Sequence, residues 1–281
     1  MDAIKTLFRR VSVYRVTLYF LIAVLALAAA LSEAGVLPYR AGDILLQAGL
    51  FVAVSWGANA LAAYFLKIRT KPESAIITGL ILACIMGPLA WEREWFVIIA
   101  ASAAAIGSKY LFAIRHRHIF NPAACGAVVS ALVLGYPASW WVGSVELLPI
   151  VFLGGILGAV KLRRLHLAAA FLCFYTALVI GDSFFLQGGS GLVIFTQSVN
   201  LLASSPLIFF ALIMLIEPMT APPSRRWGIA YGAFAAAVLF LFQRFLFEAP
   251  FLLEASLLAA NLLAAVANPF FRLSPSRVKG A

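Results

Sequence analysis

The chain has 281 residues, of which 64% are hydrophobic and 11% charged, and its mean hydropathy is +1.01. Soluble domains usually contain about 25% charged residues, so this composition excludes an ordinary soluble domain and predicts a polytopic membrane protein. The formal net charge of +10 does not indicate a nucleic-acid partner, because the basic residues form no block and do not alternate with aromatic residues.

Ten apolar segments approach the roughly 20 residues that a membrane-spanning helix needs. In chain order they lie at 15–34, 43–66, 75–90, 95–113, 120–136, 145–162, 166–182, 190–215, 227–246 and 251–268. The third, fifth and eighth segments are short or adjacent to proline. The first is longer than the core of a signal peptide, and we expect it to be retained as a span.

The positions of the charged residues predict the topology. With the N-terminus inside, all but three of the 21 Lys and Arg residues fall in inner loops, the exceptions being Arg40, Arg93 and Arg244. This asymmetry follows the positive-inside rule and predicts that both termini lie in the cytoplasm. The membrane is expected to be a bacterial-type plasma (inner) membrane. Five spans in each half require the second half to enter the membrane from the opposite side. We therefore expect an all-α fold, a single membrane domain in which 1–140 and 141–281 form two inverted five-helix repeats with broken helices.

The segment HRHIFNPAACG (116–126) is the first of two polar interruptions. Pro122 is expected in the first turn of a helix, where its missing N–H costs nothing, with Asn121 as the N-cap. A capped helix start explains this pattern by itself. The free N–H groups of a helix start also favour an anion or the carbonyl edge of a ring, and the two interpretations are compatible.

The segment IEPMTAPPSRR (216–226) is the second interruption, and its prolines prevent continuous helix. It is also consistent with a simple inner turn that is anchored by arginines. However, Glu217 directly follows the apolar run IFFALIMLI, and a carboxylate at the centre of a bilayer costs about 2.5–3.5 kcal/mol. Glu217 is therefore expected to have a partner, for which Lys109, His118 and Arg225 are the candidates.

Other chemistry finds little support in the sequence. The motifs GxxxxGK[ST], GxGxxG and HExxH are absent, which argues against a nucleotide, hydride or protease site. His116 and His118 are two positions apart and would point to opposite faces of a helix, so no metal or haem pair is expected. The cysteines lie in apolar runs without CxxC spacing and are predicted to be core residues.

Four sequence blocks carry a resemblance to a known family. They are PESAIITGLILACIMGP (72–88), GSKYLFAIRHRHIFNPAACG (107–126), YPASWW (136–141) and FALIMLIEPMTAPPSRRWGIAYG (210–232). In these blocks the chain resembles the RnfD/NqrB family, membrane proteins of the Rnf electron-transport complex and of the sodium-translocating NADH:quinone oxidoreductase. The resemblance implies a ten-helix fold of two inverted halves, similar to urea transporters, in which flavin passes electrons through the membrane.

The sequence departs from this family at one motif. Family members commonly bind FMN covalently through a threonine in an SGAT-type sequence, which this chain lacks, and neither Thr196 nor Thr220 replaces it. The resemblance therefore implies a non-covalent flavin, either riboflavin or FMN. It also implies a cytoplasmic flavin- or iron-sulfur-containing reductase as a partner, and further membrane electron-transport subunits.

The two interruptions are predicted to form the flavin site, with no catalytic residue and no metal. The predicted cofactor-binding residues are Thr78, Lys109, His118, Asn121, Pro122, Glu217, Pro218, Thr220 and Arg225. Asn121 and the N–H groups after Pro122 would face the carbonyl edge of the ring, and Lys109 or His118 would stabilise the reduced anion. Two alternatives remain, a urea-like solute channel on the same fold and a non-catalytic membrane anchor. Polar residues within the spans, such as Asn59 and Asn261, are explained by hydrogen bonds between helices.

Overall fold

The structure, a computed structural model, describes residues 11–114, 117–185, 191, 194, 196, 199–200 and 206–267. Its regular elements are helical except for two short strands, β1 (Ala113–Ile114) and β2 (Arg117–His118), which pair antiparallel. The helices and helical turns are α2 (Val13–Glu33), α3 (Ala41–Leu66), α4 (Pro72–Ile85), α5 (Trp91–Leu111), α6 (Pro122–Val129), η1 (Ser130–Leu134), η2 (Trp141–Gly143), α7 (Leu148–Lys161), α8 (Leu165–Phe185), α10 (Leu207–Phe209), η3 (Phe210–Met214), α11 (Arg225–Phe245) and α12 (Leu252–Ala267). The predicted all-α, polytopic membrane fold is confirmed.

The helices fall into two length classes. Five of them, α2, α3, α5, α8 and α11, are long and apolar enough to cross a membrane. The shorter apolar helices are α4, α6 continued by η1, α7 and α12. At 1.5 Å per residue the 14 residues of α4 extend about 21 Å, less than the roughly 30 Å of a hydrocarbon core. The ten predicted segments are therefore not ten helices of full spanning length.

Proline explains where two of the short helices begin. Pro72 and Pro122 each occupy the first turn of their helix, as the missing N–H of proline favours. The predicted segment 190–215 lies partly outside the described residues, and its described end forms α10 and η3.

Both η1 and η3 are π-helical turns, a geometry that occurs often at functional sites.

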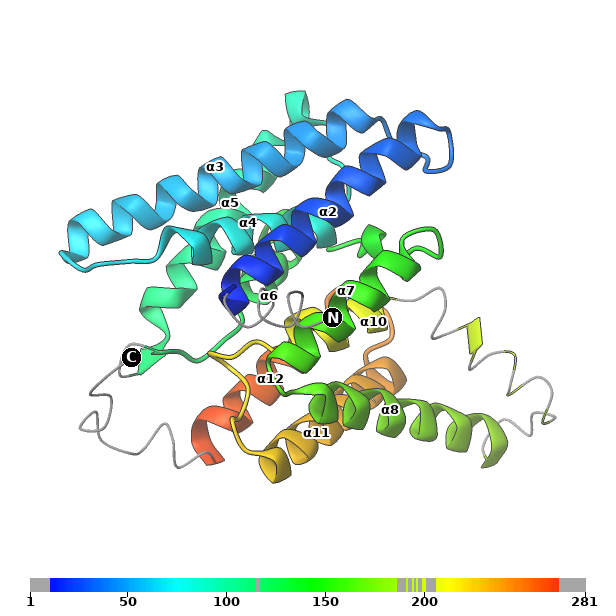
Figure 1. Ribbon diagram of the computed structural model, residues 1–281. Coiled ribbons are helices and arrows are strands. Elements are labelled where there is room, and N and C mark those ends of the chain that lie inside the picture. The colour runs from blue at the N-terminus through cyan, green and yellow to red at the C-terminus, as the bar shows by residue number, and fades with distance from the viewer. Residues whose placement is uncertain are drawn as a thin grey trace.

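Helices α6, α7 and α10 lie in the middle of the molecule (Figure 1). Figure 1 shows α2, α3, α4 and α5 on one side and α8, α11 and α12 on the other, with α6, α7 and α10 between them. Contacts of α2 with α7 and of α6 with α12 join the two groups of helices. The order of elements in 13–134 and 148–267 is compatible with two five-helix halves, and their inverted relationship stays a prediction.

Two glycines allow neighbouring helices to approach closely. A Cβ atom on Gly79 of α4 would lie 2.6 Å from the carbonyl oxygen of Phe51 in α3. A Cβ atom on Gly232 of α11 would lie 2.5 Å from the carbonyl oxygen of Leu167 in α8. Small residues at helix contacts are typical of membrane proteins, where packing replaces the hydrophobic driving force.

Candidate functional site

The first interruption forms the capped helix start that the sequence predicts. After α5 the chain passes through the β1–β2 hairpin, and α6 begins at Pro122. The Asn121 side chain accepts a hydrogen bond of 3.1 Å from the backbone N–H of Ala124, which satisfies one free donor of the first turn. Asn121 is only 2% exposed, so this helix start lies inside the protein.

The second interruption meets the first at Glu217. One carboxylate oxygen of Glu217 lies 3.0 Å from Nε2 of His118, and the other accepts a 2.9 Å hydrogen bond from Nδ2 of Asn121. The Thr220 hydroxyl donates to the same carboxylate at 3.4 Å. Among the three cationic candidates from the sequence, His118 is the residue that contacts Glu217. The polar partners explain how a carboxylate is held next to an apolar run.

Two arginines donate hydrogen bonds to backbone carbonyl groups of the second interruption. Arg117 donates to the carbonyl oxygen of Pro218 at 2.8 Å, and Arg164 donates to the carbonyl oxygens of Glu217 at 3.2 Å and Ala221 at 3.3 Å. Burial lowers the pKa of both guanidinium groups from their usual value, but an arginine stays protonated in proteins. These charge-assisted hydrogen bonds fix the path of 216–221.

A buried polar chain extends from Asn121 into the second half of the protein. The backbone N–H of Asn121 donates to Oδ1 of Asn261 at 2.8 Å, and Nδ2 of Asn261 donates to the hydroxyl of Tyr231 at 2.6 Å. Asn261 is completely buried. It therefore links α12 to α6 and α11, as expected for a polar residue that forms hydrogen bonds between helices.

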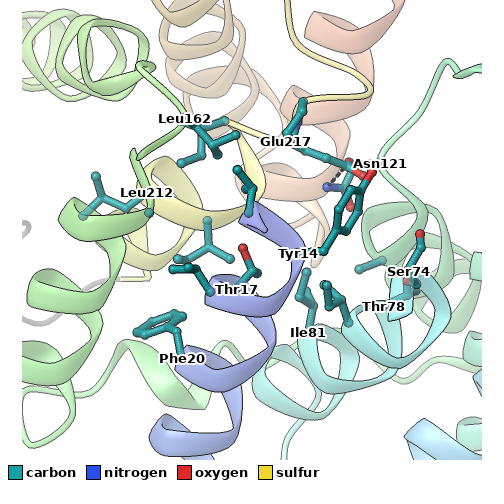
Figure 2. Close-up of a pocket in the computed structure, with 18 of the residues that line it drawn as sticks. Tyr14, Thr17, Phe20, Ser74, Thr78, Ile81, Asn121, Leu162, Leu212 and Glu217 are labelled. Carbon is teal, nitrogen blue, oxygen red and sulfur yellow. Dashed lines mark hydrogen bonds between the residues drawn. The ribbon is translucent and has the colours of Figure 1, made fainter. Parts of the chain in front are cut away.

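A cavity opens beside the junction of the two interruptions. Its residues come from α2, α4, α6, α7 and the segment 212–218, and among them are Tyr14, Thr17, Phe20, Ser74, Thr78, Ile81, Asn121, Pro122, Leu212, Glu217 and Pro218. Figure 2 shows Tyr14 next to Asn121 and Glu217 at one side of the cavity, with Phe20 and Leu212 at the other. The lining is thus apolar with a polar edge, which is typical of a small-molecule site.

The cavity leaves free space between these side chains. This empty space is about 810 Å³, part of it open to solvent.

The structure brings most of the predicted site residues together. Five of them line the cavity: Thr78, Asn121, Pro122, Glu217 and Pro218. His118 and Thr220 contact Glu217, and Lys109 donates to the backbone oxygen and hydroxyl of Ser74, a lining residue, at 3.0 and 3.1 Å. Arg225 is different, because it is an exposed residue at the start of α11 and does not line the cavity.

Several residues of the cavity were not predicted. Tyr14 and Thr17 lie in the first turns of α2, and the sequence shows only an apolar span there. Ser74 precedes Thr78 by one helical turn and accepts the Thr78 hydroxyl through its backbone oxygen at 2.9 Å. This i, i+4 spacing with Thr78 is a signal that would have indicated Ser74.

Known proteins similar to the chain are RnfD subunits of an ion-translocating oxidoreductase complex. The RnfD protein from Klebsiella pneumoniae (strain 342) is 33% identical over 113 residues, which cover 37% of this chain and 30% of that protein. Its counterpart from Escherichia fergusonii is 37% identical over 101 residues, covering 33% of this chain and 26% of that protein. The predicted resemblance to RnfD is confirmed.

The similarity to RnfD is partial in extent. In the counterpart from Psychromonas ingrahamii, the 36% identity extends over 94 residues, 30% of this chain and 25% of that protein. The chain thus matches less than a third of the length of these relatives. No family model matches the chain. The shared region supports a common type of membrane protein, and the activity of the whole relatives is not transferred with it.

Proposed function

We propose that this protein is an RnfD-like membrane electron-transfer protein, which binds a flavin without a covalent bond in the cavity between the two interruptions. The observation that carries the proposal is the meeting of Glu217 with His118 and Asn121 at the edge of a mostly apolar cavity. Broken helix inside a membrane protein is tolerated where protein or a cavity covers it. The matched relatives are named as parts of an oxidoreductase complex, which favours electron transfer over a solute channel.

The apolar walls would hold the flat faces of the ring. Phe20, Ile81 and Leu212 line the cavity away from Glu217, so a ring between them would be shielded from water. When bound, riboflavin or FMN supplies the one- and two-electron chemistry that the side chains of the protein lack.

The polar edge of the cavity would orient the ring. Ala123 lines the cavity, and its N–H lies in the first turn of α6, where helix geometry provides no acceptor. This group and the Tyr14 hydroxyl are suited to the carbonyl edge of the ring. Lys109, held next to the cavity by Ser74, would add a positive charge that favours an anion.

The partners of the protein follow from the same proposal. Electrons would come from a cytoplasmic flavin- or iron-sulfur-containing reductase, and other membrane proteins would form the complex with this chain. The relatives carry an ion-translocating complex name, so coupling to a cation is part of the proposal for this chain. The interruptions lie on the predicted inner side, where a cytoplasmic donor would reach them.

Extraction of the full-length protein in a mild detergent tests flavin binding directly. We expect the purified protein to show flavin absorbance in the visible range, and denaturation to release riboflavin or FMN that mass spectrometry identifies. Asn121→Ala should lose most of the flavin, whereas Asn59→Ala should retain it, because Asn59 bonds Thr70 and Tyr110 and does not line the cavity. Folded protein without flavin, together with solute flux in liposomes, would instead support a channel.

A further inference from the structure

A second acidic residue, Glu254 of α12, is buried outside the lining of the cavity. Its exposed fraction is 1%, and its carboxylate accepts a 2.9 Å hydrogen bond from Nε1 of Trp140. Glu254 lies near the start of the predicted segment 251–268, and the structure puts its side chain inside the protein. The proposed electron-transfer site does not use this carboxyl group.

Trp140 is held in a fixed position next to Glu254. It adopts a left-handed backbone conformation with φ of 53°, and its backbone N–H donates to the carbonyl oxygen of Ile85 at 2.8 Å. Its ring packs edge-on against Phe209 and Phe210, with centroid distances of 6.4 and 6.0 Å. Glu254 therefore faces an indole N–H that is held rigidly within an aromatic, apolar cluster.

In the described part of the chain, the elements packed against α12 bring no opposite charge to Glu254. Helix α6 contains no charged residue, and on α11 the hydroxyl of Tyr231 bonds to Asn261. Arg244 of α11 lies 3.8 Å from Asp182, and Glu254 takes part in none of the ion pairs found. A buried carboxylate without a cation is costly and becomes neutral by taking up a proton.

We propose that Glu254 is a proton-binding site of this protein, with Trp140 as the residue that positions its carboxyl group. The indole N–H stabilises the ionised form, and the apolar surroundings favour the protonated form. This balance allows the carboxyl group to bind and to release H⁺. Proton binding forms one O–H bond on a carboxylate oxygen of Glu254, and release breaks it. The proton comes from water and returns to water.

A metal cation fits this place less well than a proton. Ions such as Ca²⁺ and Mg²⁺ need about six oxygen ligands, and the described residues contain no cluster of three or more His, Cys, Asp or Glu side chains. The N–H of Trp140 also points its positive end toward the carboxylate, where it would repel a metal ion.

The position of Glu254 on α12 links it to the polar chain at the interruptions. Glu254 and Asn261 are seven residues apart and both buried, so they lie on one face of the helix about 10 Å apart. Leu257, completely buried, lies between them. On this face of α12, Leu257 thus separates Glu254 from Asn261, which accepts a hydrogen bond from Asn121. Proton binding at Glu254 does not depend on the proposed function. The coupling of this H⁺ to electron transfer does rest on it.

Infrared titration of the full-length protein in liposomes tests the site with or without flavin. Besides the C=O bands of its other carboxyl groups, the wild type should show a band from a buried, protonated carboxyl group that disappears as the pH rises. Glu254→Gln, which keeps an oxygen acceptor for Trp140, should lack this band. Glu248→Gln, at an exposed carboxylate near the same end of α12, should retain it. An unchanged band in Glu254→Gln, or no titrating band in the wild type, overturns the proposal.

Trp140→Phe provides a second measurement that does not depend on the folding of Glu254→Gln. This change keeps an aromatic ring beside Phe209 and Phe210 and removes the N–H donor. The ionised form of Glu254 then loses its hydrogen bond, so the midpoint of the band should move to higher pH. A midpoint that stays in place, or moves to lower pH, contradicts the role assigned to both residues.

Discussion

The carboxylate of Glu217 lies 3.0 Å from Nε2 of His118, although the two residues are 99 positions apart. This contact joins the two interruptions, because His118 ends β2 shortly before α6 begins and Glu217 follows η3. The same carboxylate also binds Asn121. Residues from both halves of the chain thus share one polar centre, and removal of that carboxylate charge should affect both halves.

Glu217→Gln is expected to destabilise the protein. The amide that replaces the carboxylate offers one oxygen acceptor, while His118 and Asn121 each lie at hydrogen-bonding distance from a different oxygen. A hydrogen bond to a charged group contributes about 1.5–3 kcal/mol, so we expect a loss of that order and a lower melting temperature in detergent.

Thermal unfolding followed by circular dichroism measures this loss, and Glu248→Gln serves as its control. Glu248 is exposed, so its neutralisation should change the melting temperature little. Equal melting temperatures for Glu217→Gln and the wild type would show that the Glu217 centre does not stabilise the fold.

The signals that predict this centre are local in the sequence. Asn121 before Pro122 indicates a capped helix start, and a glutamate after an apolar run indicates a partner, so both residues are found from their neighbours alone. Tyr14 gives no such signal, because an aromatic residue in an apolar helix is ordinary. Its place in the cavity depends on how α2 packs against α4 and α7.

Glu254 shows the limit of counting charges along the chain. A carboxylate near the end of an apolar segment is normally placed at the membrane surface. Its burial depends on Trp140, which lies 114 positions away and is brought to it by the packing of the aromatic residues of 209–210. The lengths of the short helices are likewise not evident from the sequence, because hydropathy does not show how these helices pack against their neighbours.

Asn121→Ala should destabilise the protein more than the loss of an ordinary N-cap. Loss of the cap alone costs about 0.5–2 kcal/mol, and the variant also removes the donor to Glu217. Ser224→Ala is the matched control, since Ser224 caps α11 near the surface and its side chain accepts a 3.4 Å hydrogen bond from the backbone N–H of Trp227.

Asn121→Asp separates the two contributions of Asn121. The aspartate keeps an acceptor for the N–H of Ala124 but places a second carboxylate next to Glu217. We expect its melting temperature to fall at least as far as that of Asn121→Ala, measured in the same detergent. A stability close to the wild type would mean that the cap, and not the bond to Glu217, is the important contribution.

Arg164→Lys should lower stability although it keeps the charge. The guanidinium of Arg164 donates to the carbonyl oxygens of Glu217 and Ala221 from two different nitrogens, a geometry that the single ammonium of lysine does not reproduce. We expect a loss of about 1–3 kcal/mol, as for buried donors and acceptors left without partners. Arg163→Lys, at the exposed neighbouring position, should have little effect in the same unfolding measurement.

Gly79→Ala is expected to disrupt the contact of α4 with α3. The added Cβ would lie 2.6 Å from the carbonyl oxygen of Phe51, so the helices must move apart at a cost of about 1–3 kcal/mol. A Cβ on Gly57 of α3 meets no atom within 4 Å, and Gly57→Ala should leave the melting temperature equal or raise it. Similar decreases for both variants would contradict this packing.

Variants of Lys109 and Arg225 test whether the flavin binds in the cavity, because both residues were predicted site residues and the structure puts only Lys109 next to the cavity. Both are cations of the predicted inner side, but only Lys109 is bound to a lining residue, through Ser74. If the flavin occupies the cavity, Lys109→Gln should weaken its retention about tenfold, which corresponds to about 1.4 kcal/mol. Arg225→Gln should leave the flavin content unchanged, because Arg225 is exposed and does not line the cavity. The ratio of flavin to protein after gel filtration measures both. A loss of flavin in Arg225→Gln with retention in Lys109→Gln would place the flavin away from this cavity, nearer the start of α11.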